Sequence, residues 1–102
     1  MAIDIFCYST QKVESVNRLM TEAQANHASH FLHNFIVGPA KEATAVHREI
    51  ADEQGLENAK SLFLIRVNTK ERANEVADVA NLIRALLGSA EVLLLIENEK
   101  KI

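Results

Sequence analysis

The sequence lacks three features that would direct its function from the outset. Cys7 is its only cysteine, which excludes an intramolecular disulfide and is typical of a protein in the reducing cytosol. The formal net charge of −3 gives no basic excess with which to neutralise phosphates. No apolar run approaches the roughly 18 residues that span a membrane, and the N-terminus has no basic region of the kind that opens a secretion signal. We therefore expect a cytoplasmic protein that binds neither nucleic acid nor membrane directly.

The composition is that of an ordinary globular domain. Apolar residues of the set AVILMFWYC make up 48% of the chain and charged residues 25%. A chain of 102 residues can bury a core without disulfides or metals. The sequence has no linker, repeat or low-complexity segment, so we expect one domain over residues 1–102, with a polar tail over residues 97–102 that is frayed apart from what Ile102 can pack against.

The most apolar part of the chain lies between residues 61 and 98. Two short apolar runs, residues 62–65 and 92–96, flank an amphipathic segment over residues 69–87. Nearly unbroken apolar runs are typical of strands buried on both faces, and the segment between them has helical periodicity. This pattern predicts a βαβ unit with the helix as the crossover, capped by Asn68.

The rest of the chain continues the alternation of strands and helices. We expect strands over residues 3–8 and 31–37, and a first helix from Gln11 to about Ala28 that Ser9 or Thr10 caps. Gly38-Pro39 is expected to open the second helix, and Gly55 to close it. Its inner stripe would contain Ala43, Val46, His47, Ile50 and Ala51.

The resulting fold class is α/β. The predicted order is β-α-β-α-β-α-β, with three helices and a single open four-stranded sheet that is mostly parallel or mixed. Strand hydrophobicity places the strands at 62–67 and 91–97 centrally and the strand at 31–37 at an edge. Asp4, on an otherwise apolar strand, is expected to reach water at an edge or at the open end of the sheet.

Candidate metal and catalytic residues are few. His27, His30 and His33 have a spacing that zinc sites use, but His33 falls in a predicted strand and no cysteine or carboxylate completes the set. The stretch Cys7-Tyr8-Ser9-Thr10 lies where a predicted strand gives way to a helix, the place where thiol-phosphate enzymes have a nucleophile, yet no glycine-bearing loop or arginine follows it. We predict no metal, no cofactor and no catalytic residue, a buried Cys7 and an ion-paired or strand-end Arg66. His47 is expected to be a hydrogen-bonded histidine at the edge of the core.

Acidic residues gather at the end of the second helix. Glu49, Asp52, Glu53 and Glu57 lie where the helix macrodipole disfavours negative charge, so helix stability does not explain them. They are either a solvated face or an acidic patch offered to a basic partner, where such charges mainly speed association. A second acidic set, Glu71, Glu75 and Asp78, marks the outer side of the third helix.

A set of short segments, in order, has a familiar pattern of strands and caps: Met1 to Tyr8, Asn26-His27, Phe35-Ile36-Val37, Glu49-Ile50-Ala51, Glu53, Gly55-Leu56, Phe63-Leu64, Val67-Asn68, Lys70, Leu93-Leu94-Leu95 and Asn98-Glu99. In these segments the chain is similar to the immunity proteins of bacterial contact-dependent growth inhibition systems, above all to the Burkholderia-type group. The similarity spreads over roughly residues 1–99 and includes no catalytic signature.

This resemblance implies a small antidote without catalytic activity. Such a protein binds the C-terminal domain of a delivered toxin, in this group a basic nuclease that cuts transfer RNA, and covers its active site. The implied state is a monomer that forms a heterodimer with its cognate toxin domain. The acidic residues on the second and third helices are then the expected partner-binding residues: Glu49, Asp52, Glu53, Glu57, Glu71, Glu75 and Asp78.

Two functions of other classes stay open. One is a small cysteine-dependent phosphate-loop enzyme or carrier domain that uses Cys7. The other is a regulatory homo-oligomer that uses the wide apolar surface of the third helix, where Val79, Leu82 and Leu86 exceed what one sheet face needs.

Overall fold

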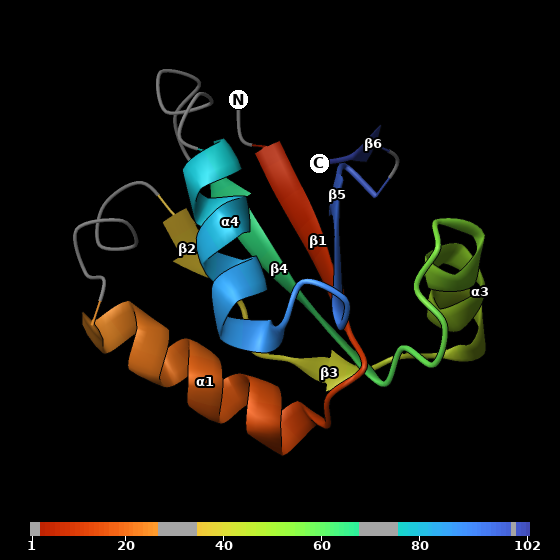
Figure 1. Ribbon diagram of the computed structural model, residues 1–102, viewed down its shortest axis with the longest axis horizontal. Helices are drawn as coiled ribbons and strands as arrows, with labels where there is room; N and C mark the ends of the chain where they lie inside the picture. The colour runs from red at the N-terminus through yellow and green to blue at the C-terminus, as the bar shows by residue number, and fades with distance from the viewer. Residues whose placement is uncertain (1–2, 27–34, 68–75, 99) are drawn as a thin grey trace.

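The computed structural model describes residues 3–26, 35–67, 76–98 and 100–102, and Figure 1 shows their arrangement. Three helices and six strands are assigned among these residues. In chain order they are β1 (Ile3–Ser9), α1 (Val13–Asn26), β2 (Phe35–Val37), β3 (Lys41–Glu42), α3 (Ala45–Glu53), β4 (Ser61–Val67), α4 (Val76–Leu87), β5 (Val92–Ile96) and β6 (Lys100–Lys101). The α/β class and the three helices are therefore as predicted.

The strands form one open sheet in the order β2-β4-β1-β5-β6, and every pairing in the described residues is antiparallel. β3 also pairs with β4, so the six strands occupy five positions across the sheet. The predicted edge position of residues 35–37 is correct, as are the inner positions of β4 and β5. The prediction of four strands, mostly parallel or mixed, is wrong.

The position of β1 explains this error. β1 lies between β4 and β5 and runs antiparallel to both, so β4 and β5 are parallel to each other without being neighbours. The predicted βαβ unit is thus present in a split form, with α4 as its crossover and the N-terminal strand inserted. The apolar runs of β4 and β5 are explained by burial on both faces of the sheet, which occurs in antiparallel strands as well as in parallel ones.

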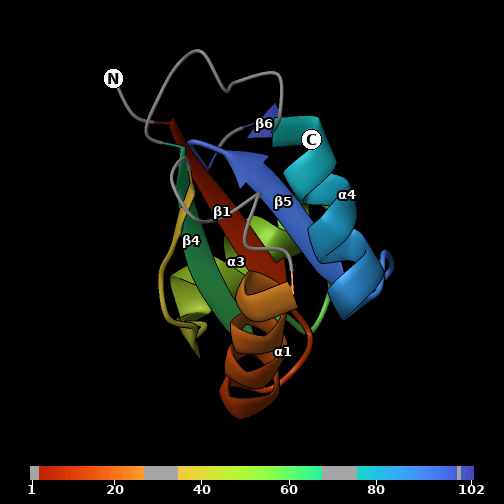
Figure 2. The same ribbon diagram turned by 90° about the vertical axis from the view of Figure 1, so that its left-hand side faces the viewer.

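Two helices cover one face of the sheet, and α3 covers part of the other (Figures 1 and 2). Alternate residues of β1, such as Ile5 and Cys7, pack with α1 and α4 in the larger core cluster. Tyr8, which follows Cys7 and points to the other face, packs in a smaller cluster with Ala51 of α3 and with Leu56 just after that helix. Because successive strand residues point to opposite faces, each inner strand contributes to both clusters.

The segment between β2 and β3 contains a bulge. Val37 pairs with Ile65, and the Gly38 N–H donates to the Leu64 carbonyl oxygen at 2.8 Å, but Lys41 pairs with Leu62. One extra residue therefore lies on the β2–β3 side of the ladder, next to Pro39, which has no N–H to donate to it. The prediction that Gly38-Pro39 opens the second helix is wrong, because proline here serves the bulge.

Helix α3 begins later than predicted, at Ala45. Thr44 is its N-cap, in an extended conformation, and its hydroxyl oxygen accepts from the His47 N–H at 3.3 Å. With this start, Ala51 is fully buried, but Val46 is 63% exposed instead of lining the inner stripe. The helix end is as predicted, since Gly55 has a left-handed φ of 102° and Leu56, which follows it, is buried.

Other predicted boundaries need smaller corrections. The Ser9 hydroxyl accepts from the Gln11 N–H at 3.0 Å, but α1 begins only at Val13, so neither Ser9 nor Thr10 is its cap. The tail over residues 97–102 is not wholly frayed, because β6 pairs with β5. The Asn68 cap and the start of the third helix lie outside the described residues, as do His27, His30 and His33.

Candidate interaction surface

Helix α3 leaves part of its sheet face open. It covers the end of the sheet where Tyr8, Leu62 and Leu93 are buried. Toward the other end, in Figure 1 the end where β1 begins, none of the helices in the described residues lies over this face. Leu64 is 38% exposed there, and Ile36 of the edge strand is 56% exposed. With Val46, these are the exposed large apolar residues in the described part of the chain.

A groove of about 390 Å³ lies where α3 meets this open face. Its floor includes Phe6 of β1 and Leu64 of β4, which are cross-strand partners. Pro39 borders it from the bulge, and Thr44 and His47 border it from the start of α3. The groove is thus mainly apolar, with a few polar groups from the helix N-terminus at its rim.

The same groups hold the wall of the groove in place. The His47 ring nitrogen Nδ1 accepts from the Thr44 N–H at 3.2 Å, which completes a reciprocal capping box with the Thr44 hydroxyl. The imidazole also lies beside the Tyr8 ring, with the ring centroids 6.3 Å apart and the ring planes tilted by 59°. His47 is therefore hydrogen-bonded at the edge of the core, as predicted.

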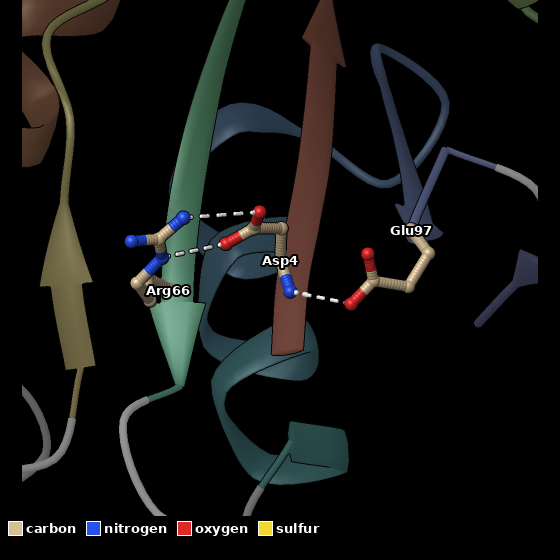
Figure 3. A network of polar contacts seen from close by, with 3 residues as sticks. All are labelled: Asp4, Arg66 and Glu97. Atoms are coloured by element: carbon tan, nitrogen blue, oxygen red, sulfur yellow. Dashed lines mark hydrogen bonds and ion pairs between the residues drawn. The ribbon is translucent and has the colours of Figure 1, made fainter. Parts of the chain in front are cut away.

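An ion pair lies on the open end of the sheet face (Figure 3). Arg66 Nε donates to Asp4 Oδ1 at 2.9 Å across the β4–β1 pair, and the Asp4 N–H donates to Glu97 Oε1 at 3.0 Å. The hydrogen bond to Asp4 and the charge of Asp4 raise the pKa of Arg66. Arg66 is ion-paired, as predicted. Asp4 lies at the open end of an inner strand, not on an edge strand.

The acidic residues of α3 lie on its solvent side. Glu49, Asp52 and Glu53 are all exposed, and so is Glu57 in the following turn. Asp78 is exposed as well, but it belongs to α4, which packs on the opposite face of the sheet. The structure therefore separates Asp78 from the α3 carboxylates, while Glu71 and Glu75 lie outside the described residues.

A comparison with protein families gives this surface a context. The family model described as "CDI System Immunity Component" matches residues 1–100. The chain belongs to this family of immunity components. The resemblance to immunity proteins of contact-dependent growth inhibition (CDI) systems is thereby confirmed.

Two comparisons, one with a curated protein and one with a solved structure from Burkholderia pseudomallei, agree with the family. Immunity protein CdiI-2 of strain 1026b is 31% identical over 99 residues, which cover 97% of each chain. A chain of the CdiA-CT/CdiI toxin and immunity complex matches the fold with a TM-score of 0.91 and 29% identity, over 97% of this chain and 95% of that one. The antiparallel sheet described above therefore has a close counterpart among solved structures.

The structure of this immunity component also bears on the residues of the two other hypotheses. Cys7 is fully buried, and burial raises the pKa of its thiol, so the neutral thiol is shielded from any substrate. Val79 is buried in the larger cluster, and Leu82 and Leu86 pack against it, so α4 uses this surface within the chain. Both findings weaken the hypotheses that depended on these residues.

A metal-binding cluster and a membrane-spanning helix are both absent from the described residues. No group of three histidine, cysteine or acidic residues there is placed to hold a metal ion. None of the helices described is long and apolar enough to cross a membrane.

Sequence reasoning missed the open sheet face. Ile36 and Leu64 lie in apolar strand segments, and nothing in those segments tells which face a helix will cover. The one available signal was the shortness of α3 between its cap and Gly55, since a nine-residue helix cannot cover a sheet of this width.

Proposed function

We propose that this immunity component binds the C-terminal toxin domain encoded with it and neutralises that toxin by covering its active site. The observation that carries the proposal is the family match over residues 1–100 together with the fold shared with a chain of a toxin and immunity complex. We further propose that the toxin is a basic nuclease that cuts transfer RNA, and that this protein is not an enzyme and acts as one half of a heterodimer.

Electrostatics support this proposal. A nuclease site that holds RNA needs positive charge, and an acidic surface on the inhibitor would take the place of the phosphates. The stretch from residue 41 to residue 60 has five carboxylates against three lysine or arginine side chains, so much of the net charge of −3 belongs to α3 and its flanks. Such charges would mainly raise the association rate.

Inhibition of the purified toxin domain tests the proposal directly. We expect this protein, added in equimolar amount, to form a one-to-one complex with the toxin domain and to abolish its cleavage of transfer RNA. A toxin domain that binds this protein but leaves transfer RNA intact would refute the nuclease assignment alone. A toxin domain that does not bind at all would refute the proposed function.

Charge reversal tests the acidic face of α3, which is formed by the exposed residues Glu49, Asp52 and Glu53. We expect the combined variant Glu49→Lys, Asp52→Lys and Glu53→Lys to associate at least about tenfold more slowly at low salt, with a smaller deficit at high salt. The matched control reverses Glu14 and Glu22, which are exposed on α1 on the other side of the sheet. Reversal of Asp78 is a separate arm, because α4 shares that other side. Equal association rates for all variants would exclude the α3 carboxylates from the interface.

A further inference from the structure

The groove beside α3 has the properties of a binding site that a small ligand would not fill. Leu64, which lines the groove, is 38% exposed, and Ile36 is 56% exposed on the sheet face next to it. Val46 does not line the groove, but it is 63% exposed in the first turn of α3, beside the lining residues Thr44 and His47. A small molecule in the groove would leave Ile36 and Val46 in water, whereas a protein surface laid over the groove and the outer side of α3 could cover all three, and exposed apolar side chains in one region mark such contacts.

The groove and the acidic face of α3 are continuous. Glu49 follows Val46 by three residues, so the two side chains are neighbours on the helix surface. On the other side of the groove, the ion pair of Arg66 and Asp4 lies at the open end of the same sheet face. The region thus has an apolar centre with charged groups around it, which is the common organisation of a protein interface.

The negative charge of α3 indicates which kind of partner covers the groove. A two-fold contact between copies of this chain would use the same surface twice and would bring the α3 carboxylates of both copies into one interface. Like charges in an interface are unfavourable, so the region suits a basic partner better than a second copy. The toxin domain of the proposed function is a partner of that chemistry.

We propose that the groove between α3 and the β3–β4 edge receives an aromatic or aliphatic side chain of the cognate toxin domain, while basic residues of the same toxin face the α3 carboxylates. This inference rests on the proposed function and deepens it, because it assigns affinity and association rate to different residues. The buried apolar contact would slow dissociation, whereas the carboxylates would speed association.

The test compares single serine variants of the exposed apolar residues. We expect Leu64→Ser and Val46→Ser each to weaken the equilibrium binding of the purified toxin domain at least about tenfold, and Ile36→Ser to weaken it less because it lies at the edge. The loss should be the same at about 0.1 M and about 1 M salt, where the screening length falls from ~10 Å to ~3 Å. This distinguishes it from the salt-dependent loss of the charge-reversal variant.

Controls keep the result interpretable. Ala77→Ser and Ala85→Ser introduce the same side chain at exposed positions of α4, on the other face of the sheet, and should bind like the wild type. Val46 and Ile36 are more than half exposed, so their variants should keep the wild-type unfolding midpoint within a few degrees.

Each remaining outcome refutes a stated claim. Wild-type binding with three unaffected serine variants would overturn this inference and leave the proposed function standing. A wild type that does not bind the toxin domain would overturn the proposed function and this inference with it. A wild type that forms dimers at tens of micromolar, dissociated by Leu64→Ser, would assign the groove to a second copy instead of the toxin.

Discussion

The capping box of α3 offers a direct test of how the acidic face is held in place. Thr44→Ala removes the hydroxyl that accepts from the His47 N–H at 3.3 Å, and leaves that N–H without its partner in the first turn. Replacement of a threonine N-cap by alanine costs about 1 kcal/mol, within a range of roughly 0.5–2 kcal/mol. In a domain of about 100 residues, 1 kcal/mol lowers the unfolding midpoint by roughly 4–8 °C.

The loss should be concentrated in α3. A helix of nine residues is far shorter than the roughly 12–15 residues that an isolated helix needs, so α3 depends on its cap and on the contacts of Ala51. We therefore expect its amides to exchange with deuterium faster in the Thr44→Ala variant, while the amides of α1 change less. Thermal unfolding followed by circular dichroism and native-state hydrogen exchange measure the two effects.

Thr21 supplies a matched control in α1. It is exposed and its hydroxyl donates to the Asn17 carbonyl oxygen one turn earlier, a bond that helices do not require. Alanine has the higher helix propensity, so Thr21→Ala should leave the midpoint unchanged or raise it slightly. Equal midpoints for Thr44→Ala and Thr21→Ala, with equal exchange rates in α3, would refute the role of the capping box.

Further experiments test three other features of the fold: the turn at Gly55, the Tyr8–Asn98 bond and the buried Cys7. Gly55→Ala should lower the free energy of unfolding by more than about 1 kcal/mol, because φ is 102° there. Gly38→Ala is the control and should cost less, because its added methyl group meets only ordinary contacts. Equal urea midpoints for the two variants would contradict this. Tyr8→Phe removes the hydroxyl that donates to Asn98 and should cost about 1 kcal/mol, and an unchanged urea midpoint would show that the bond contributes nothing. Cys7 should react with a thiol reagent only on unfolding, and reaction at the rate of a free thiol in the folded protein would contradict its burial. Burial raises the pKa of the Cys7 thiol above its ordinary value of 9.0, so above that pH the unfolded chain loses the proton more readily than the folded one. The contribution of the thiol to stability should therefore be full below pH 9.0 and decline above it. The unfolding midpoint measured against pH would show this decline, and Cys7→Ala should have a shallower one.

The sequence predicted elements better than their pairing. Most strand and helix positions, the left-handed Gly55 and the ion-paired Arg66 could be read from local patterns, because apolar periodicity and caps act over a few residues. The direction of the strands could not, since an apolar run such as Val92–Ile96 is compatible with either a parallel or an antiparallel partner. Pro39 shows the same limit, because proline suits a first helical turn and a bulged edge alike.

The candidate site was predicted only in its charged part. Glu49, Asp52 and Glu53 could be placed on one short helix from spacing alone, and they are exposed on α3. The position of the groove depends on which part of the sheet face α3 covers, and the packing of Tyr8 and Leu62 against α3 determines this. A long-range contact of this kind has no local signature in either segment.

The insertion of β1 between β4 and β5 also sets the timing of folding during synthesis. Phe6 pairs with both Leu64 and Leu95, so the first strand of the chain gains its second neighbour only when the last long strand has been made. At about 5–20 residues per second, the nascent chain spends several seconds with β1 unpaired on that edge. An open edge strand invites pairing with other chains, and contacts this distant in sequence slow folding. The complete sheet can therefore form only after Val92–Ile96 has left the ribosome.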